Sequence, residues 1–175
     1  AGYFTSVNGS TRNHLAAITA SSPDTLLSWN PDANDTVLHI HITNSTAYIG
    51  GAFTRMKWST LNLERNRLAA VTLAGAGTVT DWDPNVEGGF GANVEPVFYN
   101  GSHVYFGGEF TSVGGEPRLN AASVSLIDGS VRSWTADAAG GLVHGIWATL
   151  TRVYMGGEFT TVNGASPPHF AITSP

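Results

Sequence analysis

The 175-residue sequence contains no cysteine, few charged residues and no long apolar run. The absence of cysteine excludes disulfides, thiol nucleophiles and thiolate metal sites, although it does not fix the compartment. No apolar run approaches the roughly 20 residues that a membrane-spanning helix needs, so we expect no membrane insertion. A net charge of −5 offers no basic stripe, so we expect no nucleic-acid partner.

What the sequence does contain is glycine, at 21 of 175 residues, and a moderate share of apolar residues, at 42%. Together with only 12% charged residues, this turn-rich composition is typical of β proteins rather than of disordered chains. The length is sufficient to bury a sizeable core and is ordinary for one domain. No segment runs about 10 residues at a helical period without Gly or Pro, which argues against helical repeats.

One phrase recurs along the chain. Residues 104–115 read Val-Tyr-Phe-Gly-Gly-Glu-Phe-Thr-Ser-Val-Gly-Gly, residues 153–164 read Val-Tyr-Met-Gly-Gly-Glu-Phe-Thr-Thr-Val-Asn-Gly, and residues 48–54 and 1–9 match in part. The phenylalanines of the phrase are Phe4, Phe53, Phe110 and Phe159, at steps of 49, 57 and 49 residues. A self-similar period near 50 residues indicates a repeat architecture.

A second phrase follows the first in each unit. It begins at an arginine and ends at a tryptophan, and the pairs are Arg12 and Trp29, Arg65 and Trp82, and Arg118 and Trp134. The extra residues of the longest step fall at 56–64, which indicates an insertion in a surface loop. The resulting units are approximately 1–36, 37–92, 93–141 and 142–175.

Each complete unit contains four short runs with strand chemistry. The runs lie at 37–42, 47–53, 68–73 and 78–82 in one unit and at 94–99, 104–110, 121–126 and 131–134 in the next. Asn100-Gly101 and Asp128-Gly129 are strong signals for tight antiparallel hairpins. Four antiparallel strands in about 50 residues predict an all-β fold, a β-propeller built of four-stranded blades.

The repeated phrases resemble those of a known family, the delta-sixty β-propeller repeats. The resemblance rests on Tyr-x-Gly-Gly-Glu-Phe-Thr-x-Val-x-Gly, Arg-Asn-x-Leu-Ala-Ala-Val and a Trp-Asn-Pro or Trp-Asp-Pro strand end, and it covers nearly the whole chain. Such repeats are found in large exported bacterial and archaeal surface proteins, with a related version in fungal cortical polarity markers. The resemblance therefore implies an extracellular or cell-surface location, and it brings no catalytic residue or common ligand. The sequence departs from the pattern at Leu119-Asn120 and at Pro167-Pro168-His169.

Residues that recur in every unit are more often architectural than catalytic. The glycine pairs fall inside strands, where a bulge or a close neighbouring backbone is the usual reason for glycine. We expect the tryptophans to seal one blade against the next, and the arginines to stack on these rings or to hold a carbonyl or carboxylate. The predicted structural set is Gly50, Gly51, Phe53, Arg65, Trp82, Gly107, Gly108, Phe110, Arg118, Trp134, Gly156, Gly157 and Phe159.

Functional residues are better sought where the repeat is broken. His39 and His41 are two apart on a strand, so both imidazoles share one face at about 7 Å, which would suit a metal. However, His41 aligns with Phe98 and Trp147, and this favours a ring that fills an aromatic position. The sequence specifies no carboxylate nearby to complete a metal site.

Other candidates are isolated. Trp58, in the insertion, could contact a sugar or protein partner or fold onto the blade edge. Asp32 and Asp35 could ligate calcium but lack the loop pattern of a calcium-binding hand. The acceptor pattern for N-glycosylation occurs at four positions, which is compatible with export: Asn8, Asn34, Asn44 and Asn100.

These features predict a non-enzymatic, exported β-propeller module that needs no cofactor and acts as a structural or protein-interaction unit of a cell-surface assembly. A carbohydrate-binding, lectin-like propeller is the alternative, and a secreted glycan hydrolase using Asp81, Asp83 or Glu95 ranks last. About 3.5 blades are expected, because the first and last units are partial. Such a segment would expose strand edges and an apolar face. We therefore expect self-association, or completion of the ring by the remainder of the propeller from the same or another chain.

Overall fold

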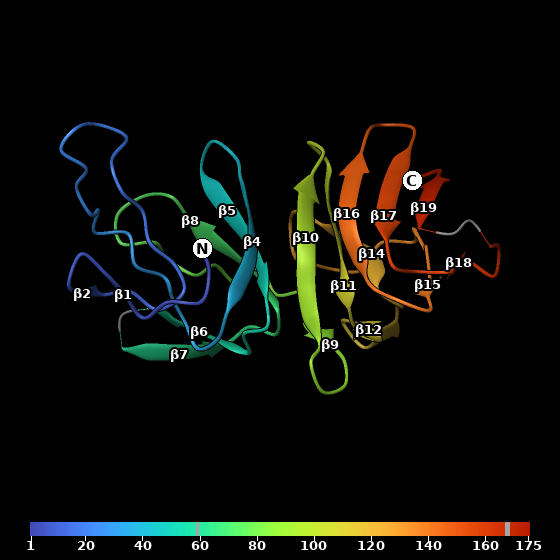
Figure 1. Ribbon diagram of the computed structural model, residues 1–175, viewed down its shortest axis with the longest axis horizontal. Coiled ribbons are helices and arrows are strands. Elements are labelled where there is room, and N and C mark those ends of the chain that lie inside the picture. Colours follow the sequence, from blue (N-terminus) through green and yellow to red (C-terminus); the bar gives the residue numbers. More distant parts are fainter. Residues whose placement is uncertain (59, 167–168) are drawn as a thin grey trace.

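The computed structural model describes residues 1–58, 60–166 and 169–175, which form strands and turns with no helix. All sheets are antiparallel, so the all-β prediction is confirmed. The described strands form an open stack of sheets rather than a closed ring (Figure 1).

Three larger sheets follow one another along the chain, each with the same strand order. The first sheet contains β4 (Val37–Ile42), β5 (Thr46–Gly51) and β8 (Leu68–Thr72). The middle sheet contains β10 (Asn93–Tyr99), β11 (His103–Glu109) and β14 (Ala121–Ser125). The last sheet contains β16 (Val143–Ala148), β17 (Val153–Gly157) and β19 (Phe170–Thr173).

The fourth predicted run of each complete unit does not form a full strand. It makes one isolated bridge to the third strand, Val71 to Val79 in the first sheet and Val124 to Val131 in the middle sheet. The tryptophan at the end of the segment is bonded to the next sheet along the chain. The large sheets are therefore three-stranded, and in the first and middle sheets a fourth segment is joined by a single bridge with two backbone hydrogen bonds around it.

Smaller sheets lie along one edge of the stack, the lower edge in Figure 1, and the sequence had not indicated them. Their strands are β1 (Ser6–Val7) with β2 (Ser10–Thr11), β3 (Asp32–Ala33) with β6 (Arg55–Trp58) and β7 (Leu61–Glu64), β9 (Val86–Glu87) with β12 (Ser112–Val113) and β13 (Glu116–Pro117), and β15 (Ala138–Ala139) with β18 (Thr161–Val162). Hairpins such as β1–β2 turn through two consecutive residues with positive φ, Asn8 at 49° and Gly9 at 74°. The insertion at 56–64 lengthens one of these hairpins, β6–β7, rather than forming an irregular loop.

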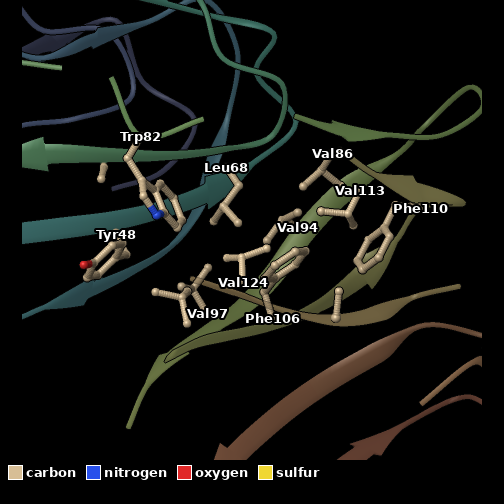
Figure 2. Packing of buried hydrophobic residues seen from close by; sticks show 13 residues of the cluster. Tyr48, Leu68, Trp82, Val86, Val94, Val97, Phe106, Phe110, Val113 and Val124 are labelled. Carbon is tan, nitrogen blue, oxygen red and sulfur yellow. The ribbon is translucent and has the colours of Figure 1, made fainter. Parts of the chain in front are cut away.

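The hydrophobic core lies between successive sheets. Figure 2 shows the cluster between the first and middle sheets, where Tyr48, Leu68 and Trp82 meet Val97 and Phe106. A second cluster joins the middle and last sheets, and a third joins the first sheet to the N-terminal segment. In Figure 1 the strands β4, β10 and β16, the first of each sheet, run side by side across the stack.

The two glycines of each pair have different neighbours. In each sheet the register of the first strand shifts, and this bulge lies against the second glycine, so that a Cβ on Gly51 would collide with the carbonyl oxygen of Thr36. The first glycine faces the next sheet. A Cβ built on Gly50 would lie 2.8 Å from the carbonyl oxygen of Val94, and one on Gly107 would lie 2.6 Å from Cγ1 of Val143. Glycine thus sets how closely the sheets approach.

One left-handed residue recurs in every unit, despite the departures from the sequence pattern. His14, Arg67, Asn120 and His169 all have φ between 62° and 67°. Asn120 donates its N–H to the carbonyl of Phe110, and its own carbonyl accepts from the N–H of Gly108. His169 makes the same pair of bonds with Phe159 and Gly157. The backbone geometry of the turn is therefore kept although the side chain differs from unit to unit.

Candidate functional site

The recurring tryptophans connect successive sheets. Trp82 packs edge-on against Tyr48 of its own sheet, with ring centroids 5.2 Å apart, and its Nε1 donates to the carbonyl of Ser125 in the middle sheet over 2.7 Å. Trp134 repeats the arrangement with Tyr105, at 5.3 Å, and donates to Oγ1 of Thr173. Both indoles are buried. Their role in the structure is to join the sheets.

The recurring arginines hold a backbone carbonyl two residues before each tryptophan. Nη2 of Arg65 donates to the carbonyl of Thr80 over 2.7 Å, and Nη2 of Arg118 donates to that of Arg132 over 3.0 Å. Arg65 also lies 3.5 Å from Oδ2 of Asp83. The sequence left open whether these arginines stack on the tryptophans or bind a carbonyl or carboxylate. In the structure both donate to a backbone carbonyl, and Arg65 also pairs with the carboxylate of Asp83.

His39 and His41 lie on the first strand of the first sheet. The N–H of Val97 donates to Nδ1 of His39 over 3.3 Å, which requires that nitrogen to be unprotonated. Burial lowers the pKa of His39, opposed by the charge of Glu95. His41 lies edge-on to Phe98 at 5.4 Å, and Phe98 in turn lies 4.3 Å from Trp147. His41 therefore belongs to a ladder of rings that crosses all three sheets.

The described part of the chain has no group of three His, Cys, Asp or Glu side chains placed to hold a metal ion. Asp83 is engaged by Arg65 and by the N–H of Asn85, and Asp81 is exposed. Asp81 is the carboxylate that lines the hollow beside it, and Glu95 does not line this hollow. The structure does not bring the hydrolase candidates together there.

The remaining candidates are spread over the surface. The side chain of Trp58 lies outside the described part of the structure, and its backbone belongs to β6. Asn8 and Asn44 are exposed in hairpin turns. Asn34 accepts hydrogen bonds from the N–H groups of Thr54 and Arg55, and Asn100 accepts from Ser102 and His103, so both amides are already engaged.

The outward face of the last sheet is apolar and exposed. Phe170 and Ile172 are 55% and 53% exposed, whereas Leu68 and Ala70 hold the same positions in the first sheet at 0% and 3%. A Cβ on Gly156 would meet only the carbonyl oxygen of His169, at 3.8 Å. No sheet of the described chain covers this face, and a shallow hollow of about 320 Å³ lies on it.

A polar recess opens where the middle and last sheets meet. Its volume is about 280 Å³, and its wall is formed by the edges of Tyr105 and Trp134. Side chains from both sheets line it: Asn100, Ser102, His103, Tyr105, Ser123, Arg132, Ser133, Trp134, Leu150 and Pro175. Sequence reasoning had not singled out these residues as a site.

The preceding pair of sheets has an equivalent recess of about 260 Å³. Tyr48 and Trp82 form its wall in the same edge-on geometry, and Leu126 and Ile127 reach it from the middle sheet. The rims differ. Thr46, Ala70, Thr80 and Asp81 take the positions of His103, Ser123, Arg132 and Ser133. Comparing the units position by position would have shown these changes in the sequence.

The electrostatics of the first recess are set by Arg132. Burial lowers the pKa of His103, and the Arg132 charge lowers it further. Burial raises the pKa of the Tyr105 phenol, opposed by Asn100 and Arg132. With His103 and Tyr105 neutral at pH 7, Arg132 is the charged group among the described side chains that line this recess.

Across residues 1–58, 60–166 and 169–175 there is no helix with the length and apolarity needed to cross a membrane. Comparison with known proteins adds no relative to this picture: no family model, no curated protein and no solved structure matches the chain.

Proposed function

We propose that the chain is a segment of a β-propeller of the delta-sixty type, and that it acts as a non-enzymatic structural or protein-interaction module of an exported assembly. The recurrence of one sheet order, one tryptophan link and one arginine bond in successive units supports the propeller. The resemblance of the repeats to those of exported surface proteins, and the exposed acceptor asparagines Asn8 and Asn44, support export.

The strongest support is the uncovered face of the last sheet. The same face of the first and middle sheets is covered by a following sheet, whose first strand places Val94 and Val97, or Val143, on the glycine. Exposed apolar patches of this kind mark interaction sites. The occupant we propose is a further sheet of the same repeat type, with an aliphatic side chain positioned to cover Gly156.

The protein's own repeat supplies the test. A longer chain is made from residues 1–174 followed by a second copy of residues 126–175, because Pro175 holds the repeat position of Leu126. In the longer chain the copied Val143 should cover Gly156 as the original Val143 covers Gly107. Gly156→Ala should then cost roughly 1–3 kcal/mol of stability through overpacking. In the present chain the same change should be nearly neutral.

Gly107→Ala is the matched control, since its neighbour is present in both chains and it should destabilise both. Denaturant melts of the two chains, with and without each substitution, give the four changes in the free energy of unfolding that the comparison needs. Docking of a further sheet on this face would be ruled out if Gly156→Ala had the same small effect in both chains while Gly107→Ala destabilised both.

A further inference from the structure

We propose that the recess between the middle and last sheets is a binding site for a small ligand bearing an oxyanion group, which the guanidinium of Arg132 recognises. This site is separate from the uncovered sheet face, and the inference does not rest on the proposed function. The shared chemistry is a carboxylate, sulfate or phosphate group.

The first support is the charge of the recess. Arg132 has no ion-pair partner in the described chain, where the two ion pairs are Arg65–Asp83 and His144–Glu158. No Asp or Glu side chain lines the recess, although the protein as a whole carries a net charge of −5, and the carboxylate of the last residue, Pro175, which also lines the recess, forms no ion pair with Arg132. A guanidinium without a carboxylate is suited to planar, bidentate recognition of an oxyanion.

Neutral hydrogen-bonding groups surround this charge. The Ser102 hydroxyl donates to Oδ1 of Asn100 and lies 3.0 Å from Nδ1 of His103, so Nε2 is the ring nitrogen that a ligand can reach, and an oxyanion would bind the tautomer that carries its proton there. Ser123, at 1% exposure, belongs to the inner wall, where the other two units have Ala70 and Ile172. The imidazole and the exposed hydroxyl of Ser133 beside the guanidinium provide the additional contacts that a tetrahedral or carboxylate group can use.

The equivalent recess shows that packing does not require these residues. The first and middle sheets pack with the same tyrosine–tryptophan wall although the rim carries Thr46, Thr80 and Asp81. Asp81 in that rim would repel an anion. The positive charge and the imidazole are therefore additions to a repeated framework, confined to one recess.

The volume limits the ligand to about the size of one sugar ring or smaller, since drug-sized ligands occupy roughly 300–1,000 Å³. Tyr105 and Trp134 are too deeply buried to offer a stacking face, at 2% and 7% exposure. Recognition must therefore come from the charge and the hydrogen bonds rather than from aromatic stacking. Uronic acids, inorganic sulfate and inorganic phosphate are the probes of choice, with glucose as the uncharged control.

The experiment is isothermal titration of the whole chain with glucuronate, sulfate, phosphate and glucose. The test variant Arg132→Thr introduces the residue that the equivalent recess already has, so the sheets should still pack. Arg152→Thr removes an exposed arginine outside the recess and is the matched charge control. Melting curves and near-ultraviolet dichroism confirm that each variant is folded.

We expect saturable binding of at least one oxyanion and none of glucose. Binding should weaken at least tenfold in Arg132→Thr, by a smaller factor in His103→Thr, and not at all in Arg152→Thr. Binding of glucuronate alone would identify a uronic acid as the source, and binding of sulfate or phosphate alone an inorganic or ester oxyanion.

A gain-of-binding variant provides an independent check. Thr46→His, Thr80→Arg and Asp81→Ser, introduced together into Arg132→Thr, should restore binding at the other recess. The inference is overturned if no oxyanion binds, if glucose binds as well as glucuronate, or if Arg152→Thr weakens binding as much as Arg132→Thr.

Discussion

The indole Nε1 of Trp82 donates a 2.7 Å hydrogen bond to the carbonyl of Ser125, which lies 43 residues later and in the next sheet. Trp29 makes the equivalent bond to Thr72 over 2.8 Å. The ring fills space between two sheets while its N–H is bonded at a defined point of the second sheet. One side chain therefore contributes both apolar burial and the register between sheets.

Removing this ring should be costly. Trp82→Ala deletes a buried aromatic side chain and should reduce the free energy of unfolding by roughly 3–5 kcal/mol. Trp82→Phe keeps most of the apolar volume and removes the indole hydrogen bond to the Ser125 carbonyl, which still accepts from the N–H of Gly129, so the loss should be about 0.5–1.5 kcal/mol. Denaturant melts measure both. A cost below about 1 kcal/mol for the alanine variant would contradict the role assigned to the ring.

The glycines of the sheet interfaces should separate into two classes. Gly107→Ala should destabilise the protein by roughly 1–3 kcal/mol, because its Cβ would collide with Val143. Gly156→Ala should be neutral or stabilising by up to about 1 kcal/mol, because alanine suits a strand better than glycine where space allows. Equal losses for the two variants would show that the last sheet is covered in solution.

The histidine ladder makes a third prediction. His41→Phe should be tolerated within about 1.5 kcal/mol, because Phe98 holds the same position in the next sheet and the two rings already lie edge to edge. Added zinc should not raise the melting temperature of the protein, since a ligand that binds only the folded state must stabilise it. A zinc-dependent rise that disappears in the double variant His39→Ala, His41→Ala would instead establish a metal site.

Stability should depend on pH through His39. Its pKa is lowered in the folded state by burial, so the unfolded chain binds the proton more readily. The contribution of neutral His39 to the free energy of unfolding is fully present above the unfolded pKa of about 6.5, and it is lost as the pH falls from there towards the lowered folded pKa. His39→Asn keeps an acceptor for the Val97 N–H and should reduce this dependence, leaving the part contributed by His41 and His103, whose pKa values burial also lowers. Melts over this range test the sign, and a stability that rises as the pH falls would contradict it.

Most of the sheet framework could be predicted from the sequence, because the repeat aligns strands that single segments would leave ambiguous. The runs at 37–42 and 121–126 match β4 and β14 closely. The extent of strand pairing at 78–82 is smaller than the sequence predicts. The strand chemistry of this run is the same whether it pairs along its whole length or only at Val79. The small hairpins were missed because two-residue strands carry too little alternation to detect.

The candidate site was harder to predict. His39 and His41 stand out in the sequence because two histidines alternate on a strand, yet their partners are a backbone N–H and aromatic rings. His103 and Arg132 are 29 residues apart and unremarkable one by one. They become a pair only when the fold places them on the rim of one recess.

The separation between a constant wall and a variable rim has a consequence for how such a chain can change. A substitution at position 46, 80, 103 or 132 alters a recess while the tyrosine and tryptophan that hold the sheets together remain the same residues. Each recess can then acquire its own chemistry independently of its neighbours. The two junctions between successive sheets each have such a recess, and its rim residues can change while the tyrosine and tryptophan of its wall stay the same.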